Sequence, residues 1–557
     1  MKKTTASALA LLLAASVQAQ SPDASRPVKG SVEAVAAEVE VLVVDKKGTP
    51  VEGLTKNDFK LFVNGKEMPL DWFEAPPAPG ASATAPVPVS PAAAPPVTAM
   101  VATRRAHSTV FVISPLQLDL RARNAGLDAL RTYADRLPDG EQVSVYLLDN
   151  GARRLVGFTS DRKEMKKAID RTGRSLPTSY IFGARSDEWV GRSRQMLRNF
   201  GTVLDSLASR PEPKTVVVLS GPISPTGLVS PIGNAAGSAA LAQTTFTVSS
   251  SMPNFFISKG NIEHETSTLS PAPMSESVSA NGNSLATRGQ WMFLGEAKEV
   301  EGQALLARAT IVALDPTGLL APGAQADVNT LGQDLIAASD PWEFRNDTFA
   351  MVAAATGGAR LGFSNKPADL IVDESRLLAR RYRLGFTPPD ATSARRDIRV
   401  DVMRPGLVVR TASGQRSLTA ETAARSRFAG LLLSAQAPTG DFTIAVEMKS
   451  PIVKRTDDAL PFDVLVPVSG VYAEDRGENR RAKLELLVSA VDDEGRASEP
   501  MVIPFSVELA KATAVNGAFF RKDSTFSIDK HWKGRLFVGV RDTATNRLGA
   551  VAMPIGG

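Results

Sequence analysis

The sequence predicts a multidomain chain with a small N-terminal all-β module, a central doubly wound α/β domain and a C-terminal all-β sandwich. Residues 38–73 contain alternating charged and branched side chains and the hairpin signal Asn64-Gly65. From 109 to 386, uninterrupted apolar strands alternate with amphipathic helical segments, as in sheets covered by helices on both faces. Beyond about Phe428, short strands follow one another with turn residues between them, which is typical of a β-sandwich.

Length and composition agree with several globular domains and exclude some chemistry. The 557 residues predict three or four domains, and 43% hydrophobic with 22% charged residues are ordinary globular values. Cysteine is absent, which excludes disulfides, thiolate metal sites, a cysteine nucleophile and a lipid anchor attached through cysteine. The only histidines are His107, His264 and His531, far apart in sequence, which disfavours a histidine-rich metal site.

The first 19 residues have the three parts of a secretory signal. Lys2 and Lys3 precede an apolar run over 6–15, and the small residues Val17 and Ala19 predict cleavage after Ala19. A retained membrane anchor is the alternative, but the apolar run is shorter than the roughly 20 residues that span a membrane. We therefore expect an exported chain, periplasmic or extracellular, with no membrane span after signal cleavage.

The remaining charge gives no indication of a nucleic-acid partner. Removing Lys2 and Lys3 lowers the formal net charge from +5 to +3. Nucleic-acid binding proteins concentrate cations and interleave aromatic residues with them. Here aromatic residues make up 6% of the chain and the basic pairs are dispersed among acidic residues. We expect solvated surface charge and no nucleic acid as a partner.

Composition also predicts the domain boundaries. The N-terminal β module is expected at 31–74, followed by a linker at 75–103 with eight prolines and no charged side chain, which predicts a semi-rigid spacer. The α/β domain is expected at 104–414, with an irregular insert at 221–288, rich in small polar residues, that we expect to be mostly disordered or loosely packed. The β-sandwich is expected at 428–557.

Hydrophobic patterns predict the individual elements of the last two domains. The strands of the α/β domain are expected at 109–113, 143–148, 215–219, 310–314, 359–363 and 381–386, with the same domain continuing through 398–403 and 407–411. Its helices are expected at 120–137, 161–171, 188–208, 296–307, 346–355 and 367–379. No convincing helix is expected beyond about 428, where strands are predicted at 441–448, 462–467, 482–492, 502–509, 526–528 and 534–542.

The chain resembles exported bacterial proteins that carry a divergent von Willebrand factor A (VWFA)-related domain. The resemblance spans about 32–414 and rests on VVDKKGTPVEGLTKNDFKLFVNGKEMPLDWFE (43–74), TIVALDPTGL (310–319), AAATGGARLGF (353–363), RRYRLGFTPPD (380–390) and RPGLVVRTASG (404–414). It implies that the N-terminal module is immunoglobulin (Ig)-like and that the central domain has the VWA (Rossmann-like) fold. None of these motifs is catalytic.

The resemblance also implies where a metal would bind. A-type domains often hold a divalent cation through Asp-x-Ser-x-Ser after the first strand, a threonine and a further aspartate. Here the corresponding loops contain Ser114, Thr178 and Ser220, and both aspartates are missing. Because neutral hydroxyls hold magnesium only with a carboxylate nearby, we expect no metal and no cofactor unless Asp119 or Asp315 is rearranged into the site. Ser114, Thr178 and Ser220 are then either a vestigial polar pocket or turn residues.

Other motifs carry little chemistry. The acidic run 492–494 lacks calcium-loop spacing and is interpreted as a solvated hairpin turn. Nucleophile-elbow, Walker-type and dinucleotide-binding glycine motifs are all missing from the sequence, so we expect no catalytic residues. The prediction is an exported, non-catalytic interaction or adhesion-type protein that binds a protein or cell-surface component. The alternatives are a metal-dependent adhesion module with a rearranged site and an envelope hydrolase that uses a serine or aspartate pair.

Overall fold

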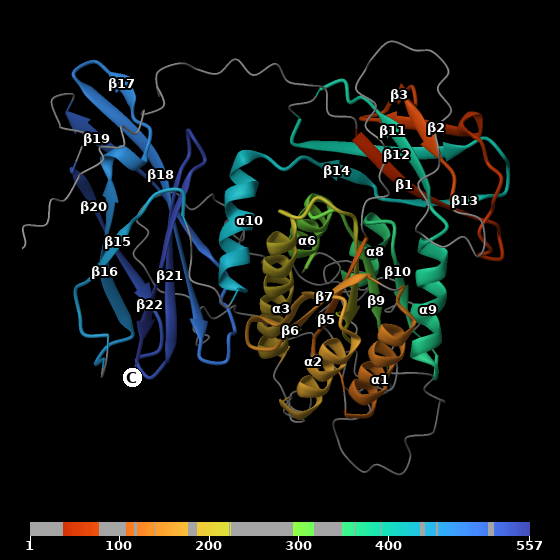
Figure 1. The fold of residues 1–557 in the computed structure, drawn as a ribbon, viewed down its shortest axis with the longest axis horizontal. Helices are drawn as coiled ribbons and strands as arrows, with labels where there is room; N and C mark the ends of the chain where they lie inside the picture. Colours follow the sequence, from red (N-terminus) through yellow and green to blue (C-terminus); the bar gives the residue numbers. More distant parts are fainter. Residues whose placement is uncertain are drawn as a thin grey trace, which may run out of the picture.

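The computed structural model describes the greater part of the chain (Figure 1). The described residues are 37–76, 107–115, 118, 120–138, 140–175, 186–221, 223, 293–316, 348–362, 364–390, 393–434, 440–452, 455–510 and 517–556, without the side chains of 174–175 and 186–190. The signal at 1–19, nearly all of the spacer and of the insert, and Thr178 lie outside them.

The centre of the molecule is a six-stranded mixed sheet in the order β10-β9-β8-β5-β6-β7. All neighbours are parallel except β7, which pairs antiparallel with β6. The strands are β5 (Ser108–Ile113), β6 (Gln142–Leu148), β7 (Ala152–Thr159), β8 (Lys214–Leu219), β9 (Ala309–Leu314) and β10 (Ala359–Leu361). Every residue of β5, β8 and β9 is buried, which explains their continuous apolar sequence.

Helices cover both faces of this sheet, which confirms the predicted α/β layering. Apolar residues of α1 (Leu120–Arg136), α2 (Arg162–Ser175) and α9 (Pro367–Leu378) form one core with one face of the strands. The opposite face packs against α3 (Ser186–Leu207), α6 (Leu294–Leu306) and α8 (Thr348–Ala355). Strand β7 was not predicted, although the Asn150-Gly151 turn that precedes it is a hairpin signal.

The N-terminal β module is larger than the sequence predicted, because strands from beyond the α/β domain complete it. Its two sheets have the orders β13-β1-β11-β4 and β14-β12-β2-β3. The strands are β1 (Ala37–Val44), β2 (Phe59–Val63), β3 (Lys66–Met68), β4 (Trp72–Glu74), β11 (Tyr382–Phe386), β12 (Arg395–Val402), β13 (Val408–Thr411) and β14 (Gly414–Arg416). A short 3-10 helix (Lys56–Asp58) leads into β2.

The expectation that 381–386, 398–403 and 407–411 continue the α/β domain is therefore wrong. Strand β11 pairs antiparallel with β1, and β12 pairs antiparallel with β2. The reason is visible in β12, whose exposed and buried residues alternate, as in an antiparallel sheet with one face toward water. The α/β domain is thus inserted between two halves of one β module, as Figure 1 shows at its upper right.

A helix and a β-sandwich form the C-terminal part. Helix α10 (Ala420–Leu432) begins at the N-cap Thr419, whose hydroxyl accepts from the Thr422 backbone N–H, and it packs on α3. The expected strands are present in antiparallel sheets, β15-β16-β20 and β17-β18-β21-β22, with β19 beside β18, whereas β17 and β22 were not predicted. Their bounds are β15 (Ala445–Met448), β16 (Ala459–Pro467), β17 (Glu474–Arg476), β18 (Asn479–Asp492), β19 (Met501–Ala510), β20 (Phe519–Ser527), β21 (Gly534–Asp542) and β22 (Leu548–Ile555), with a 3-10 turn at Val468–Gly470.

The two sheets enclose a separate apolar core that includes Leu460, Phe462, Leu486 and Val538. Within the described part of the chain, no helix has the length and apolar character needed to cross a membrane.

Candidate functional site

The carboxyl edge of the central sheet is where this topology places a ligand site. Strand β5 has β6 on one side and β8 on the other, so the chain leaves β5 in opposite directions, and open α/β sheets place their ligand sites at the carboxyl ends of the strands at such a point. The parallel ladder continues one residue past each strand. Ser114 N–H donates to the Leu219 carbonyl at 2.8 Å, Ser220 N–H to that of Leu314 at 3.1 Å, and Asp315 N–H to that of Leu361 at 2.8 Å.

Two of the three predicted site residues lie side by side at this edge. Ser114 and Ser220 follow neighbouring strands and are both fully buried. The Ser220 hydroxyl donates to the Gly221 carbonyl at 2.9 Å, so it acts in part as a turn residue. Thr178 lies outside the described residues, and its part in a common pocket stays a prediction.

A buried ion pair lies next to the two serines, and the sequence did not predict it. The Asp315 carboxylate is 3.8 Å from the Arg360 guanidinium, and the two side chains are 6% and 4% exposed. Arg360 Nη1 also donates to the Ser220 carbonyl at 3.4 Å. The sequence indicates Asp315 as a possible oxygen ligand but gives no sign of Arg360, because only the parallel register of β9 and β10 brings the two together.

The charge balance of this edge follows from that pair. A divalent cation needs oxygen ligands with net negative charge, and the described edge offers two neutral hydroxyls and one carboxylate already facing a guanidinium. A cation that bound Asp315 would have to displace or repel Arg360. Among the described residues, no three histidine, aspartate or glutamate side chains are grouped to hold a metal ion.

A carboxylate, an imidazole and a hydroxyl lie in series at the opposite, amino end of the sheet. His107 Nδ1 is 3.4 Å from Glu141, and its Nε2 is 3.1 Å from the Thr215 hydroxyl. A catalytic triad has the same order of groups, but here the hydroxyl is on a residue that is 5% exposed. The contacts tie together the amino ends of β5, β6 and β8, and His107 itself is exposed.

The acidic run 492–494 and His531 make local contacts. The Asp492 carboxylate accepts from the backbone N–H groups of Glu494 at 3.0 Å and Arg496 at 2.8 Å, which confirms the hairpin-turn interpretation of 492–494. His531 is exposed, and its backbone N–H donates to Asp529 at 2.7 Å. His264 lies outside the described residues.

Comparison with known proteins gives structural similarities only. No family model and no curated protein matches the sequence. Among solved structures, BatB from Bacteroides thetaiotaomicron is 12% identical with a TM-score of 0.22, covering 49% of this chain and 98% of its own. A von Willebrand factor type A structure from Catenulispora acidiphila is 11% identical with a TM-score of 0.17, covering 81% and 65%.

A third similar structure holds the three N-terminal domains of the type V pili tip protein Mfa5 from Porphyromonas gingivalis. It is 10% identical with a TM-score of 0.22, covering 81% of this chain and 70% of its own. At these TM-scores the similarities carry no weight for function.

Proposed function

We propose that this chain is an exported, non-catalytic binding protein that contacts a protein or cell-surface component through the carboxyl edge of its central sheet. The observation that carries the proposal is the buried Asp315–Arg360 pair beside Ser114 and Ser220. It supplies a cation from within the chain, at the place where open α/β sheets present their ligand sites. Binding there then depends on surface fit rather than on a bridging metal.

The rest of the chain supports a display role. The signal-like segment at 1–19 suits an exported chain, either periplasmic or extracellular. The central domain is VWA-like in this proposal. It is inserted in an Ig-like β module and followed by a second β-sandwich, with no cofactor required.

An exposed apolar side chain at the carboxyl edge of the central sheet provides a position for a test substitution. Leu120 begins α1, just beyond the carboxyl end of β5, and is 52% exposed. Met403, in the N-terminal β module, is 56% exposed and provides a matched control far from that edge. A charge introduced at either surface position is expected to change the stability of the fold little, by roughly 0.5 kcal/mol or less.

The experiment captures partners from an envelope extract with the tagged mature chain, the Leu120→Arg variant and the Met403→Arg variant, each with EDTA and with Mg²⁺. We expect one partner to be retained by the wild type and by Met403→Arg, lost with Leu120→Arg, and insensitive to EDTA. Equal capture by all three proteins, or no reproducible partner, contradicts the proposal.

The metal-dependent adhesion module remains the second candidate, because the Asp315 carboxylate does lie at this edge. Capture that requires Mg²⁺ and is abolished by EDTA would favour it. Esterase or peptidase activity that disappears with His107→Ala would instead favour the hydrolase alternative.

A further inference from the structure

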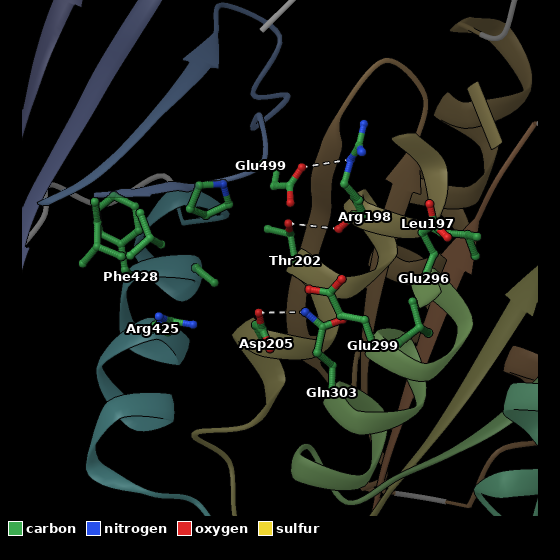
Figure 2. Close-up of a pocket in the computed structure, with 15 residues that line it drawn as sticks. Leu197, Arg198, Thr202, Asp205, Glu296, Glu299, Gln303, Arg425, Phe428 and Glu499 are labelled. Carbon is green, nitrogen blue, oxygen red and sulfur yellow. Dashed lines mark hydrogen bonds and ion pairs between the residues drawn. The ribbon is translucent and has the colours of Figure 1, made fainter. Parts of the chain in front are cut away.

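A cavity lies between the central domain and the C-terminal sandwich, away from the candidate site. Its walls come from α3, α6, α10 and the sandwich, and its volume is about 270 Å³ (Figure 2). Ligand pockets for drug-sized molecules are roughly 300–1,000 Å³, so this cavity suits a ligand of few heavy atoms.

Acidic side chains predominate in its lining. The lining contains four carboxylates, those of Asp205, Glu296, Glu299 and Glu499. It contains two guanidinium groups, those of Arg198 and Arg425. Glu499 is paired with Arg198 at 2.9 Å, and Arg194 from outside the lining pairs with Glu296 at 2.9 Å.

Two carboxylates of the described residues lack a cation within ion-pair distance. Arg425 is shared between Glu421 at 3.1 Å and Glu485 at 3.8 Å, both outside the cavity lining. Among the described residues, no cationic group lies within 4 Å of the carboxylates of Asp205 or Glu299. The cavity therefore holds two carboxylates, one from α3 and one from α6, with no ion-pair partner within 4 Å among the described residues, and Arg425 and Arg416 act on Asp205 from a greater distance.

The Asp205 carboxylate is held in place by the helix packing. Gln303 Nε2 on α6 donates to Asp205 Oδ2 at 3.1 Å, and Figure 2 shows this contact at the cavity wall. Gly201, one turn earlier on α3, allows the close approach, because a Cβ there would lie 2.3 Å from Gln303 Oε1. Burial raises the pKa of Asp205 from 3.8 to about 6, and the like charge of Glu299 adds to the effect.

The other walls are apolar. Leu197, Val300, Phe428, Leu487 and Val502 line the same space. Moving the methylene groups of a ligand from water onto such a surface is favourable. A bare metal ion gains nothing from it, and no metal-binding cluster is found among the described residues.

We propose that this cavity binds a small organic amine, with its ammonium group beside Asp205 and Glu299 and its alkyl chain against Val300 and Phe428. The hydrogen bond from Gln303 fixes the anionic partner before the ligand arrives, which lowers the ordering cost of binding. This cavity is separate from the carboxyl edge of the central sheet. Either proposal can therefore fail while the other holds.

The test uses the full mature chain and the probe 1,5-diaminopentane, with 1,5-pentanediol as a neutral probe of the same length and with matched ionic strength. We expect about 10 mM diamine to raise the Tm and to give a titration isotherm, because a ligand bound to the native state alone stabilises it. The diol should produce neither. A shift from the diol or from CaCl₂ equal to that from the diamine contradicts an amine site, and so does the absence of any shift with the diamine.

Variants locate the site. Asp205→Asn, which keeps the acceptor for Gln303, and Glu299→Gln should each weaken diamine binding about tenfold or more. Glu67→Gln, an exposed residue of β3 in the distant N-terminal module, is the matched control and should bind as the wild type does. Far-UV circular dichroism and the Tm without ligand establish that each variant is folded. Wild-type affinity in Asp205→Asn would overturn the proposal.

The pH dependence gives a further readout. Asp205 is faced by Glu299 from α6, Arg425 from α10 and Arg416 from β14. Its carboxyl must be ionised to hold an ammonium group, so affinity should fall as pH drops through about 6. Asp205→Asn should lose that step, and a wild-type affinity that is flat between pH 5 and 7 would contradict the role of Asp205.

Discussion

At the scale of single residues, the two acidic side chains Asp315 and Asp205 show how the same group takes different roles. Asp315, at the sheet edge, faces Arg360, a cation supplied by the next strand. Asp205, in the cavity, accepts a hydrogen bond from the Gln303 amide, with Arg425 and Arg416 farther away, and burial raises the pKa of its carboxyl to about 6. Asp315 therefore has a cationic partner beside it, whereas Asp205 has no cation within ion-pair distance among the described residues.

Arg360→Met tests the Asp315–Arg360 pair. Removing one partner of a buried ion pair costs about 3–5 kcal/mol, and we expect the lower end because the two groups are 3.8 Å apart. The variant should then gain Tm with millimolar Mg²⁺, because Asp315 no longer faces a cation, whereas the wild-type Tm should not change. Thermal melts with MgCl₂ or EDTA give the comparison. Adding Asp315→Asn should remove the response, and a Mg²⁺ response in the wild type would contradict the account.

At the scale of elements, local pattern predicted strands and helices well but could not predict which strands pair. The continuous apolar composition of β5, β8 and β9 is enough to predict them as buried strands. Strands β1 and β2, which pair with β11 and β12, lie more than 300 residues earlier in the chain, and no local signal specifies this pairing. The same limit applies to the candidate site: Ser114 and Ser220 could be predicted from strand ends, whereas Arg360 beside Asp315 depends on sheet register.

Gly385→Ala tests the pairing of strands across the inserted domain. A Cβ at Gly385 on β11 would lie 1.9 Å from the indole of Trp72 on β4, so the ring and its strand must move. Overpacking of this kind typically costs about 1–3 kcal/mol. Gly157→Ala on β7 is the control, because nothing lies within 4 Å of its Cβ position. Urea unfolding should show a loss for Gly385→Ala alone; equal midpoints for the two variants would contradict the pairing.

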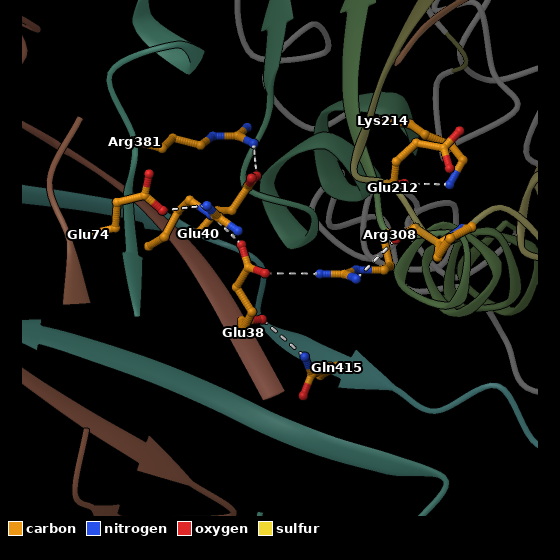
Figure 3. Close-up of polar contacts among 10 residues, drawn as sticks. Glu38, Glu40, Glu74, Glu212, Lys214, Arg308, Arg381 and Gln415 are labelled. Carbon is orange, nitrogen blue, oxygen red and sulfur yellow. Dashed lines mark hydrogen bonds and ion pairs between the residues drawn. The ribbon is translucent and has the colours of Figure 1, made fainter. Parts of the chain in front are cut away.

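At the scale of the whole molecule, the two β modules are joined to the central domain in different ways. The N-terminal module contacts it through ion pairs, among them Arg308–Glu38 at 3.6 Å, and Figure 3 shows this group beside Lys214. Lys214 is itself buried, and its ammonium donates to the carbonyls of Arg210, Glu212 and Ala307 at 2.7 to 2.9 Å. The C-terminal sandwich instead shares one apolar core with α3, to which Phe428, Leu432 and Phe537 contribute.

Phe428→Ala tests whether this shared core couples the sandwich to the central domain. Phe428 on α10 is 1% exposed, and a Cβ at Gly539 on β21 would lie 2.9 Å from its ring, so the ring fills the junction closely. Truncating a buried phenylalanine costs about 3–5 kcal/mol, and here the loss falls on the contact between two units rather than within one. The wild type should therefore show one joint calorimetric transition for the two units, and Phe428→Ala should separate it into two. Phe519→Ala, at a side chain 59% exposed on β20, should leave the joint transition intact. A single transition in Phe428→Ala, merely shifted to lower temperature, would mean that the backbone bridge between Ala152 and Ala497 holds the units together without the ring.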